Sequence, residues 1–405
     1  MTPGTRPPGP LPYAPMQTPQ LPEPDPESLA RSRQLQERIR ARIEEAGGWL
    51  PFDAYMQMAL YEPGLGYYDA AGRKFGAEGD FVTAPEISPY FARAIAAQVA
   101  QVFASTPAEV LEFGAGTGAL ARELMHDLER RGAPVRRYRI VEISADLRAR
   151  QQERLSGLPV EWLDTLPEGF SGVILANEVL DVLPVRLFVR GADTVFERGV
   201  AWDPQRGGPV FAGRPADATL RREVAAIEAA LFPEPPLDPE AGRLPEGYGS
   251  EWCPLAAAWI AALGACLERG VALLFDYGFP RREYYHPQRA MGTLMCHYRQ
   301  RSHADPLWLP GLNDITAHVD FSACADAARD AGLEVLGYTS QARFLMNAGI
   351  LDRMIADGAR AQDAGAVQRL LSEAEMGELV KAFALGRGID PPLLGFTNGD
   401  RRSRL

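Results

Sequence analysis

The fold is decided by the stretch Glu109-Val110-Leu111-Glu112-Phe113-Gly114-Ala115-Gly116-Thr117-Gly118. A short apolar run carrying an acid near its end breaks into three glycines at every second position, and helix-forming residues follow over 119–131. This order predicts a strand, a tight turn and a helix, the opening unit of a nucleotide-binding α/β sheet. Glycine at these positions lets the backbone approach a ligand closely, so that N–H groups at the helix start can reach it.

The glycine loop alone does not identify the nucleotide, because Gly114–Ala119 also satisfies the loose dinucleotide pattern of NAD-binding proteins. Two acids favour S-adenosylmethionine. Glu112 lies two residues before the first glycine, where a carboxylate can face the cationic methionine part and would repel a pyrophosphate. Glu142 ends a second predicted strand, 138–143, where an acid can accept both ribose hydroxyls. The alternative is a glycine turn that binds no ligand.

Length and composition narrow the class of protein. At 405 residues the chain exceeds one average domain, and 46% hydrophobic with 23% charged residues is ordinary for a globular protein. A net charge of -11 argues against a protein that coats nucleic acid, and no apolar run is long enough for membrane insertion. Four scattered cysteines without a C-x-x-C pair fit a reducing cytoplasm.

The chain divides into four predicted segments. Residues 1–27 are dense in proline, so we expect a disordered tail. Residues 28–107 begin with an amphipathic helix over 28–46, whose apolar positions are Leu35, Ile39 and Ile43, and continue as an aromatic, glycine-rich lid. Residues 108–340 form the cofactor-binding core, with an inserted β-rich region at about 187–250. Residues 341–405 are expected to be helical. Alternating strand and helix patterns in the core predict a mostly parallel sheet with right-handed crossovers and helices on both faces.

Three polar residues follow the predicted strand 172–176, namely Asn177, Glu178 and Asp181. Ligands of open α/β sheets bind outside the carboxyl ends of the strands, so these side chains should lie near the reactive end of a cofactor. Asn177 and Asp181 could instead cap the following turn. Asp164, just past another strand, could hydrogen-bond an adenine amino group or be a surface turn acid.

Further candidates stand later in the chain. Glu251 precedes a predicted helix, and Asp276 ends the predicted strand 271–276; either acid could face a pocket or serve a turn. His318 is a candidate base or a hydrogen-bonded loop residue, and Asp320 is most simply the N-cap of the helix that follows. These histidines and acids lack the spacing of a metal site, so we expect no metal.

Taken together, these motifs resemble the methyltransferase family of the mitochondrial complex I assembly factor known in its simpler forms as midA, which has bacterial relatives. The resemblance covers roughly 34–398 and rests on seven blocks: Leu60–Tyr68, Gly79–Glu86, Glu112–Gly118, Glu142–Ser144 with Leu147-Arg148, Asn177–Pro184, Asp276–Gly278 and Asp314–Phe321. The chain has Ala92 where the family commonly has glycine, and Val182 where it often has alanine. Neither change removes a polar group.

The resemblance implies a Rossmann-like class I methyltransferase fold with inserted α+β elements, S-adenosylmethionine as cofactor, and an arginine of a respiratory complex I subunit as methyl acceptor. The guanidinium is cationic, and its nitrogen is a poor nucleophile. We therefore expect a carboxylate to accept two of its N–H groups in bidentate geometry, which concentrates electron density on the third nitrogen. The expected catalytic residues are Glu178 first, then Asp181 and Glu251, with His318 as proton acceptor. The expected cofactor-binding residues are Glu112, Gly114, Gly116, Gly118, Glu142, Asp164 and Asn177, under a lid of Gly79, Asp80, Phe81 and Thr83.

Other functions stay open on the sequence alone. The chain could be an assembly chaperone that binds the cofactor and holds a partner subunit without essential catalysis. It could also be a small-molecule methyltransferase or, more remotely, an NAD oxidoreductase. We expect a cytoplasmic protein if the source is bacterial and a mitochondrial matrix protein if it is eukaryotic. The oligomeric state does not follow from the sequence.

Overall fold

The computed structural model describes residues 21–69, 82–233, 242–390 and 392–405, and these residues form two compact units. Unit 1 is assembled from the described residues within Met1–Gly72, Val182–Leu255 and Arg281–His318, and unit 2 from those within Arg73–Asp181, Ala256–Pro280 and Val319–Leu405. Each unit is thus built from three separate stretches of chain. The predicted inserted region near 187–250 lies in unit 1, and 281–318 joins the same unit, which no signal in the sequence indicates.

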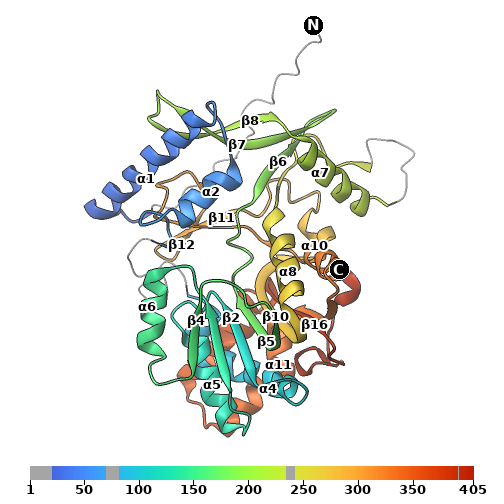
Figure 1. Cartoon of the computed structure of the whole chain (residues 1–405). Coiled ribbons are helices and arrows are strands. Elements are labelled where there is room, and N and C mark those ends of the chain that lie inside the picture. Colours follow the sequence, from blue (N-terminus) through green and yellow to red (C-terminus); the bar gives the residue numbers. More distant parts are fainter. Residues whose placement is uncertain (1–20, 70–81, 234–241, 391) are drawn as a thin grey trace. The chain divides into compact units, whose positions relative to one another are not determined.

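Unit 2 contains an eight-stranded sheet in the order β15-β16-β10-β5-β2-β3-β4, with β14 beside β10. Figure 1 labels five of its strands, β4, β2, β5, β10 and β16. The strands β4, β3, β2, β5 and β10 pair in parallel. Helices α5 and α6 connect successive parallel strands, as the alternating pattern predicted, and the Rossmann-like α/β class is confirmed. The strands are β2 (Glu109–Phe113), β3 (Arg137–Val141), β4 (Val160–Leu163), β5 (Phe170–Asn177), β10 (Leu267–Phe279), β14 (Val319–Asp320), β15 (Glu334–Ser340) and β16 (Val380–Arg387).

The strand β16 corrects the prediction of a wholly helical C-terminal segment. It lies between β10 and β15 and pairs antiparallel with both. Strand β15 therefore forms the edge of the sheet and does not pair with β10 directly. The residues Val380–Phe383 are buried without alternation. A short buried run of this kind, which includes Lys381, does not distinguish a central strand from a buried helix.

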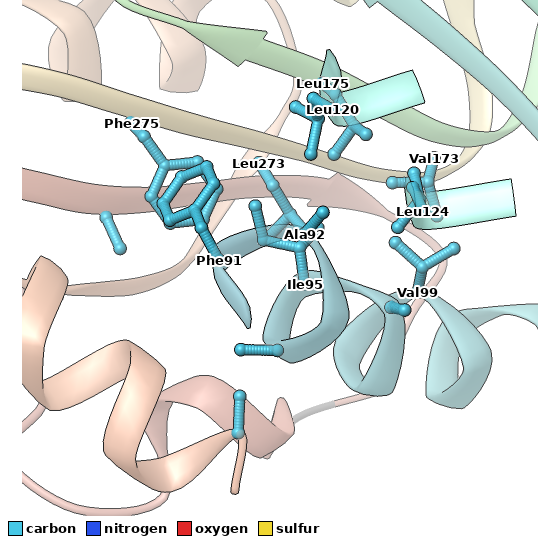
Figure 2. Close-up of a cluster of buried hydrophobic side chains, with 14 of the residues drawn as sticks. Phe91, Ala92, Ile95, Val99, Leu120, Leu124, Val173, Leu175, Leu273 and Phe275 are labelled. Atoms are coloured by element: carbon cyan, nitrogen blue, oxygen red, sulfur yellow. The ribbon is translucent and has the colours of Figure 1, made fainter. Parts of the chain in front are cut away.

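Helices cover both faces of this sheet. On one face, Phe91, Ile95 and Val99 of α4 pack with alternate residues of β5 and β10 (Figure 2). On the other face, Phe113 at the end of β2 meets Trp259 of α8, with ring centroids 5.0 Å apart. The helices of unit 2 are α3 (Ala84–Ile87), α4 (Pro89–Phe103), α5 (Ala119–Arg130), α6 (Ala145–Arg154), α8 (Pro254–Cys266), α10 (Phe321–Asp330), α11 (Gln341–Asn347), α12 (Ile350–Ala356), α13 (Ala361–Leu371) and α14 (Met376–Leu379), with short 3₁₀ turns at Leu394–Phe396 and Arg402–Arg404.

Unit 1 contains a five-stranded sheet and a three-stranded sheet. In the first, the order is β1-β7-β6-β9, and β8 also pairs with β7; in the second, the order is β12-β11-β13. Helix α1 begins after Asp25, which accepts the Ser28 N–H at 2.8 Å, and buries Leu35, Ile39 and Ile43 as its period predicted. The elements are α1 (Pro26–Glu45), β1 (Leu50–Pro51), α2 (Phe52–Tyr61), β6 (Arg186–Arg190), β7 (Val195–Asp203), β8 (Gly208–Pro215), α7 (Ala218–Leu231), β9 (Gly249–Trp252), α9 (Arg281–Tyr284), β11 (Met295–Tyr298), β12 (Arg301–His303) and β13 (Asp314–Thr316).

No helix among the described residues is both long enough and apolar enough to cross a membrane.

Candidate functional site

The carboxyl ends of β2, β3, β5 and β10 meet along one edge of the unit 2 sheet. Phe113 is in register with Val141 of β3 and with Ala176 of β5. Asn177 is in register with Phe275 of β10. Because parallel strands end at the same edge, the glycine loop, Glu142 and the polar residues after β5 are brought together there.

The glycine loop leaves β2 in a conformation that needs its glycines. Gly114, Gly116 and Gly118 have φ angles of 57°, 52° and 83°, all in the left-handed region. A Cβ on Gly116 would meet no atom within 4 Å, whereas a Cβ on Gly114 would lie 3.3 Å from Val179. The loop therefore opens a space at Gly116 and passes close to the residues that follow β5.

Glu112 is buried one residue before the end of β2. The Tyr138 hydroxyl of the neighbouring strand donates to its Oε2 at 2.7 Å. Burial raises the pKa of Glu112 to about 7, and the hydrogen bond from Tyr138 opposes that rise. The carboxyl group is therefore held in place and poised between its neutral and charged forms near neutral pH.

Glu142 lies just beyond β3 and is tied to the glycine loop through Gln151 of α6. Its carboxylate accepts the Ser144 N–H and the Gln151 amide, each at 2.9 Å, and the same Gln151 amide donates to the Gly116 carbonyl at 2.9 Å. Trp162 of β4 holds the other end of Gln151 by donating to its Oε1 at 2.9 Å. Burial raises the pKa of Glu142. This network fixes the acid beside the loop, and the sequence analysis did not foresee Gln151.

Ile143 follows Glu142 and is 75% exposed, although isoleucine is among the residues most often buried. It presents an apolar surface directly after the acid that is expected to hold the ribose, where a flat base could lie. Asp164, the predicted adenine contact, is exposed and forms an ion pair with Arg148 at 2.7 Å. Its contacts thus agree with the surface-acid alternative, and its contact with adenine stays a prediction.

The predicted lid is described only at its end. Gly79, Asp80 and Phe81 lie outside the described residues. Thr83 is the N-cap residue of the short helix α3. From the same helix Glu86 accepts hydrogen bonds from Thr117 of the glycine loop and, at 3.0 Å, from Arg154 of α6. The segment that ends the predicted lid is therefore bonded to the glycine loop.

The polar turn after β5, hereafter the acidic turn, comprises residues 177–181. Glu178 has a φ of 54°, a left-handed conformation that is uncommon for a residue with a side chain, and such residues cluster at functional sites. Its N–H donates to the Phe275 carbonyl at 2.8 Å, and its carboxylate accepts the Asn177 amide at 3.0 Å and the Ala84 N–H at 3.4 Å. The Oδ1 of Asn177 is buried without a hydrogen-bond partner in the described part of the chain.

The negative charges of three carboxylates act on Tyr277 at this edge. Burial raises the pKa of Tyr277, and the negative charges of Glu178, Asp181 and Asp276 raise it further. Asp181 is only 5% exposed. Asp276 lies within β10, which runs on to Phe279, three residues beyond the predicted strand end. Its carboxylate accepts N–H groups from Val179 at 3.1 Å and from Leu180 at 2.7 Å. The structure therefore brings the predicted Glu178 and Asp181 together and adds Asp276, which the sequence analysis left undecided.

Glu251, predicted to grip the acceptor, lies in unit 1 and is fully engaged by its own unit. Its carboxylate accepts the N–H groups of Thr293 and Leu294 at 2.7 and 2.9 Å, and the hydroxyls of Ser250 and Tyr284 at 3.2 and 3.4 Å. Burial raises its pKa, and these hydrogen bonds oppose the rise. Such contacts are those of a residue that anchors a loop.

His318, the predicted proton acceptor, also belongs to unit 1 and is half-buried. Its backbone N–H donates to the Thr293 hydroxyl at 2.9 Å, so it is attached to the loop that Glu251 holds. Asp320 accepts the N–H groups of Ser322 and Ala323 at 3.0 and 3.1 Å, which confirms it as the N-cap of α10.

The residues at the unit 2 edge fit an adenosyl cofactor. Gly116 opens onto space that a Cβ would partly fill, and the buried Oδ1 of Asn177 lacks a donor within the described residues. An acid beside the loop and an exposed apolar residue after it match the ribose and the base. In the ranges that the structure describes, no group of three His, Cys, Asp or Glu side chains could hold a metal ion.

Comparison with known proteins identifies the class. A family model described as "Putative S-adenosyl-L-methionine-dependent methyltransferase" matches residues 92–339. The chain belongs to this family. It is a methyltransferase, and its cofactor is S-adenosylmethionine. The resemblance inferred from the motifs is thereby confirmed.

Individual relatives agree with this family assignment. The mouse protein named "Protein arginine methyltransferase NDUFAF7, mitochondrial" is 30% identical over 379 residues, covering 82% of this chain and 79% of the relative. The zebrafish protein of the same name is 30% identical over 383 residues, covering 84% of each chain. A Burkholderia thailandensis crystal structure, described as a "likely methyl transferase" bound to S-adenosyl-homocysteine, is 48% identical. It matches with a TM-score of 0.87 over 95% of this chain and 100% of that one.

Proposed function

We propose that the protein transfers a methyl group from S-adenosylmethionine to a guanidinium nitrogen of an arginine in another protein. The observation that carries this proposal is the acidic turn. Glu178 stands in a left-handed conformation directly after Asn177, which pairs with Phe275 at the carboxyl edge of the sheet, and Asp181 follows in the same turn. The name of the mouse and zebrafish relatives, protein arginine methyltransferase, supports the same acceptor.

The proposed mechanism assigns the acceptor to the carboxylates. A guanidinium is cationic at neutral pH, and its nitrogen is a poor nucleophile. Glu178 would accept two of its N–H groups in bidentate geometry, which fixes its plane and leaves electron density on the third nitrogen. Asp181 would supply a second negative charge, and alignment of the reacting nitrogen contributes most of the remaining rate gain. When bound, S-adenosylmethionine supplies an electrophilic methyl group on a sulfonium sulfur.

The other predicted residues receive different parts in this proposal. Gly114, Gly116, Gly118 and Glu142 would hold the adenosyl group, while Glu112 and Asn177 would face its methionine part. His318 stays the proposed proton acceptor for the methylated nitrogen. For Glu251 the four hydrogen bonds to its carboxylate favour a role in anchoring a loop over direct contact with the acceptor.

We propose an arginine of a respiratory complex I subunit as the acceptor, on the resemblance to the complex I assembly factor family. The net charge of -11 suits a cationic acceptor segment, because opposite charge speeds encounter. The protein would act in the cytoplasm of a bacterium, or in the mitochondrial matrix of a eukaryote, where the relatives are named as mitochondrial.

The test is methyl transfer from S-adenosylmethionine carrying an isotopically labelled methyl group to purified complex I subunits. We expect mass spectrometry to find the label on arginine, and Glu178→Gln to lower transfer by at least about a hundredfold, the usual scale for loss of a catalytic group. Glu129→Gln, an exposed change on α5, is the matched control and should leave transfer unchanged. Glu178→Gln with normal transfer would refute the role of Glu178. Subunit assembly that is unaffected by Glu178→Gln would favour a chaperone instead.

A further inference from the structure

Asp276 makes contacts that the proposed mechanism does not use. It is 1% exposed and directly follows Phe275, the last residue of β10 that pairs with β5. Its Oδ2 accepts two successive backbone N–H groups of the acidic turn, those of Val179 and Leu180. Its Oδ1 accepts the N–H of Tyr277 at 2.8 Å. A buried carboxylate is costly unless it is fully hydrogen-bonded, and this one is bonded mainly to the backbone of another strand's turn.

A second observation concerns the backbone that these bonds enclose. Glu178 immediately precedes Val179 and has a φ of 54°. A residue with a side chain persists in this sparsely populated region only when its surroundings over-determine it. Two groups of β10 supply these surroundings. The Phe275 carbonyl accepts the Glu178 N–H at 2.8 Å, and the carboxylate of the next residue, Asp276, accepts the N–H groups of Val179 and Leu180. Phe275 and Asp276 of β10 therefore accept the N–H groups of Glu178 and of the two residues that follow it.

We propose that Asp276 is a positioning residue, which holds Glu178 in its left-handed conformation by accepting the backbone N–H groups of the acidic turn. Asp276 would not touch the acceptor. It would act through Glu178, and in this respect the inference rests on the proposed function. Without the carboxylate, Val179 and Leu180 would lose their acceptor, and the turn could relax to a conformation that aims the Glu178 side chain elsewhere.

The test measures the turn directly, by amide hydrogen exchange of the segment 177–183. We expect exchange to quicken in the order wild type, Asp276→Asn, Asp276→Ala, because an amide oxygen makes weaker bonds than a carboxylate and alanine makes none. Asp320→Ala is the matched control. It removes an aspartate that also accepts two successive N–H groups in unit 2, and it should leave exchange over 177–183 unchanged.

Activity separates positioning from general stability. We expect Asp276→Ala to lower methyl transfer at least about tenfold, while the dissociation constant for S-adenosyl-homocysteine changes less than about threefold. In the double variant with Glu178→Gln, transfer should fall no further than with Glu178→Gln alone, because both changes remove the same aligned carboxylate. A merely structural role would multiply the two losses instead.

The outcomes keep the two proposals apart. If no arginine is methylated by the wild type, the proposed function fails, but exchange over 177–183 still decides whether Asp276 holds the turn. If Asp276→Ala does not fold, amide exchange rates within the wild-type protein test the inference. Val179 and Leu180 should then exchange far more slowly than Gln205 and Arg206, whose N–H groups are likewise accepted by one aspartate, Asp203, in an exposed turn. Equal exchange in either comparison, or multiplied losses in the double variant, would overturn the inference.

Discussion

A methyl group added at Gly116 should separate cofactor binding from folding. Gly116 has a φ of 52°, and a Cβ there would meet no protein atom within 4 Å. The cost of Gly116→Ala to the free energy of unfolding is therefore only that of forcing alanine into the left-handed region, about 1 kcal/mol. If the adenosyl group occupies the space in front of the loop, the same Cβ must displace it, and we expect S-adenosyl-homocysteine to bind at least about tenfold more weakly.

Gly132→Ala is the matched control. Gly132 follows α5 with a φ of 73°, and a Cβ there would likewise meet nothing within 4 Å. Both variants should lower the free energy of unfolding by the same amount in a denaturant titration, but only Gly116→Ala should weaken binding in calorimetry. Gly114 and Gly118 are less suitable, because their added Cβ atoms would lie 3.3 Å from Val179 and 3.2 Å from Leu155. Unaltered affinity in Gly116→Ala would refute the assignment of this loop to the cofactor.

Three further substitutions test other parts of the structure. Gly292→Ala, at a φ of 74°, would make a Cβ clash with Oε1 of Glu251, so we expect it to cost about 2–3 kcal/mol of unfolding free energy in a denaturant titration. Its affinity for S-adenosyl-homocysteine should be unaltered, which checks that unit 2 is intact. The pKa of Glu112 is raised from 4.5 to about 7, so the folded state holds its proton more tightly than the unfolded state; stability from this group is complete below pH 4.5 and is lost as pH rises to about 7. The free energy of unfolding should therefore fall by roughly 3 kcal/mol less between pH 4.5 and 7 in Glu112→Gln than in the wild type. An identical pH dependence in the two proteins would contradict a raised pKa of Glu112. Ile143→Ser should weaken S-adenosyl-homocysteine binding several-fold yet change stability by less than about 0.5 kcal/mol, since the side chain is 75% exposed; full affinity would exclude a base lying on it.

The elements nearest the cofactor were predictable because their signals are local. The glycine loop needs three residues in the left-handed region, and the sequence carries three glycines at those positions. The apolar spacing of α1 likewise identified the buried face of Leu35, Ile39 and Ile43. Local geometry and short-range periodicity are written in consecutive residues, so one sequence is enough to recognise them.

The rest depends on contacts between distant residues. Strand β16 is a short buried run whose partners, β10 and β15, lie far from it in the chain, so its class is settled by pairing rather than by periodicity. Within the described ranges, the strands of the stretch 281–318 pair only with one another. The stretch joins the rest of unit 1 through a bridge between Gly249 and Met291 and through Glu251, which accepts the N–H groups of Thr293 and Leu294. Neither signal is present in the local sequence.

The direction in which a buried acid points was equally hidden. Glu251 precedes a predicted helix and Asp276 ends a predicted strand. At such positions a carboxylate can contact a ligand or accept hydrogen bonds within a turn. The structure shows each carboxylate accepting successive backbone N–H groups of another segment, which no spacing rule predicts. Glu178 differed because its polar neighbours Asn177 and Asp181 crowd one strand end, and that crowding is visible in the sequence.

The most direct test of the central claim is a crystal structure of the protein with S-adenosyl-homocysteine and a peptide containing the acceptor arginine. We predict the adenosyl group in front of Gly116 and beside Glu142, with two guanidinium N–H groups donating to the Glu178 carboxylate at about 2.8 Å. A guanidinium bound away from the acidic turn, while the adenosyl group lies at the glycine loop, would contradict the account.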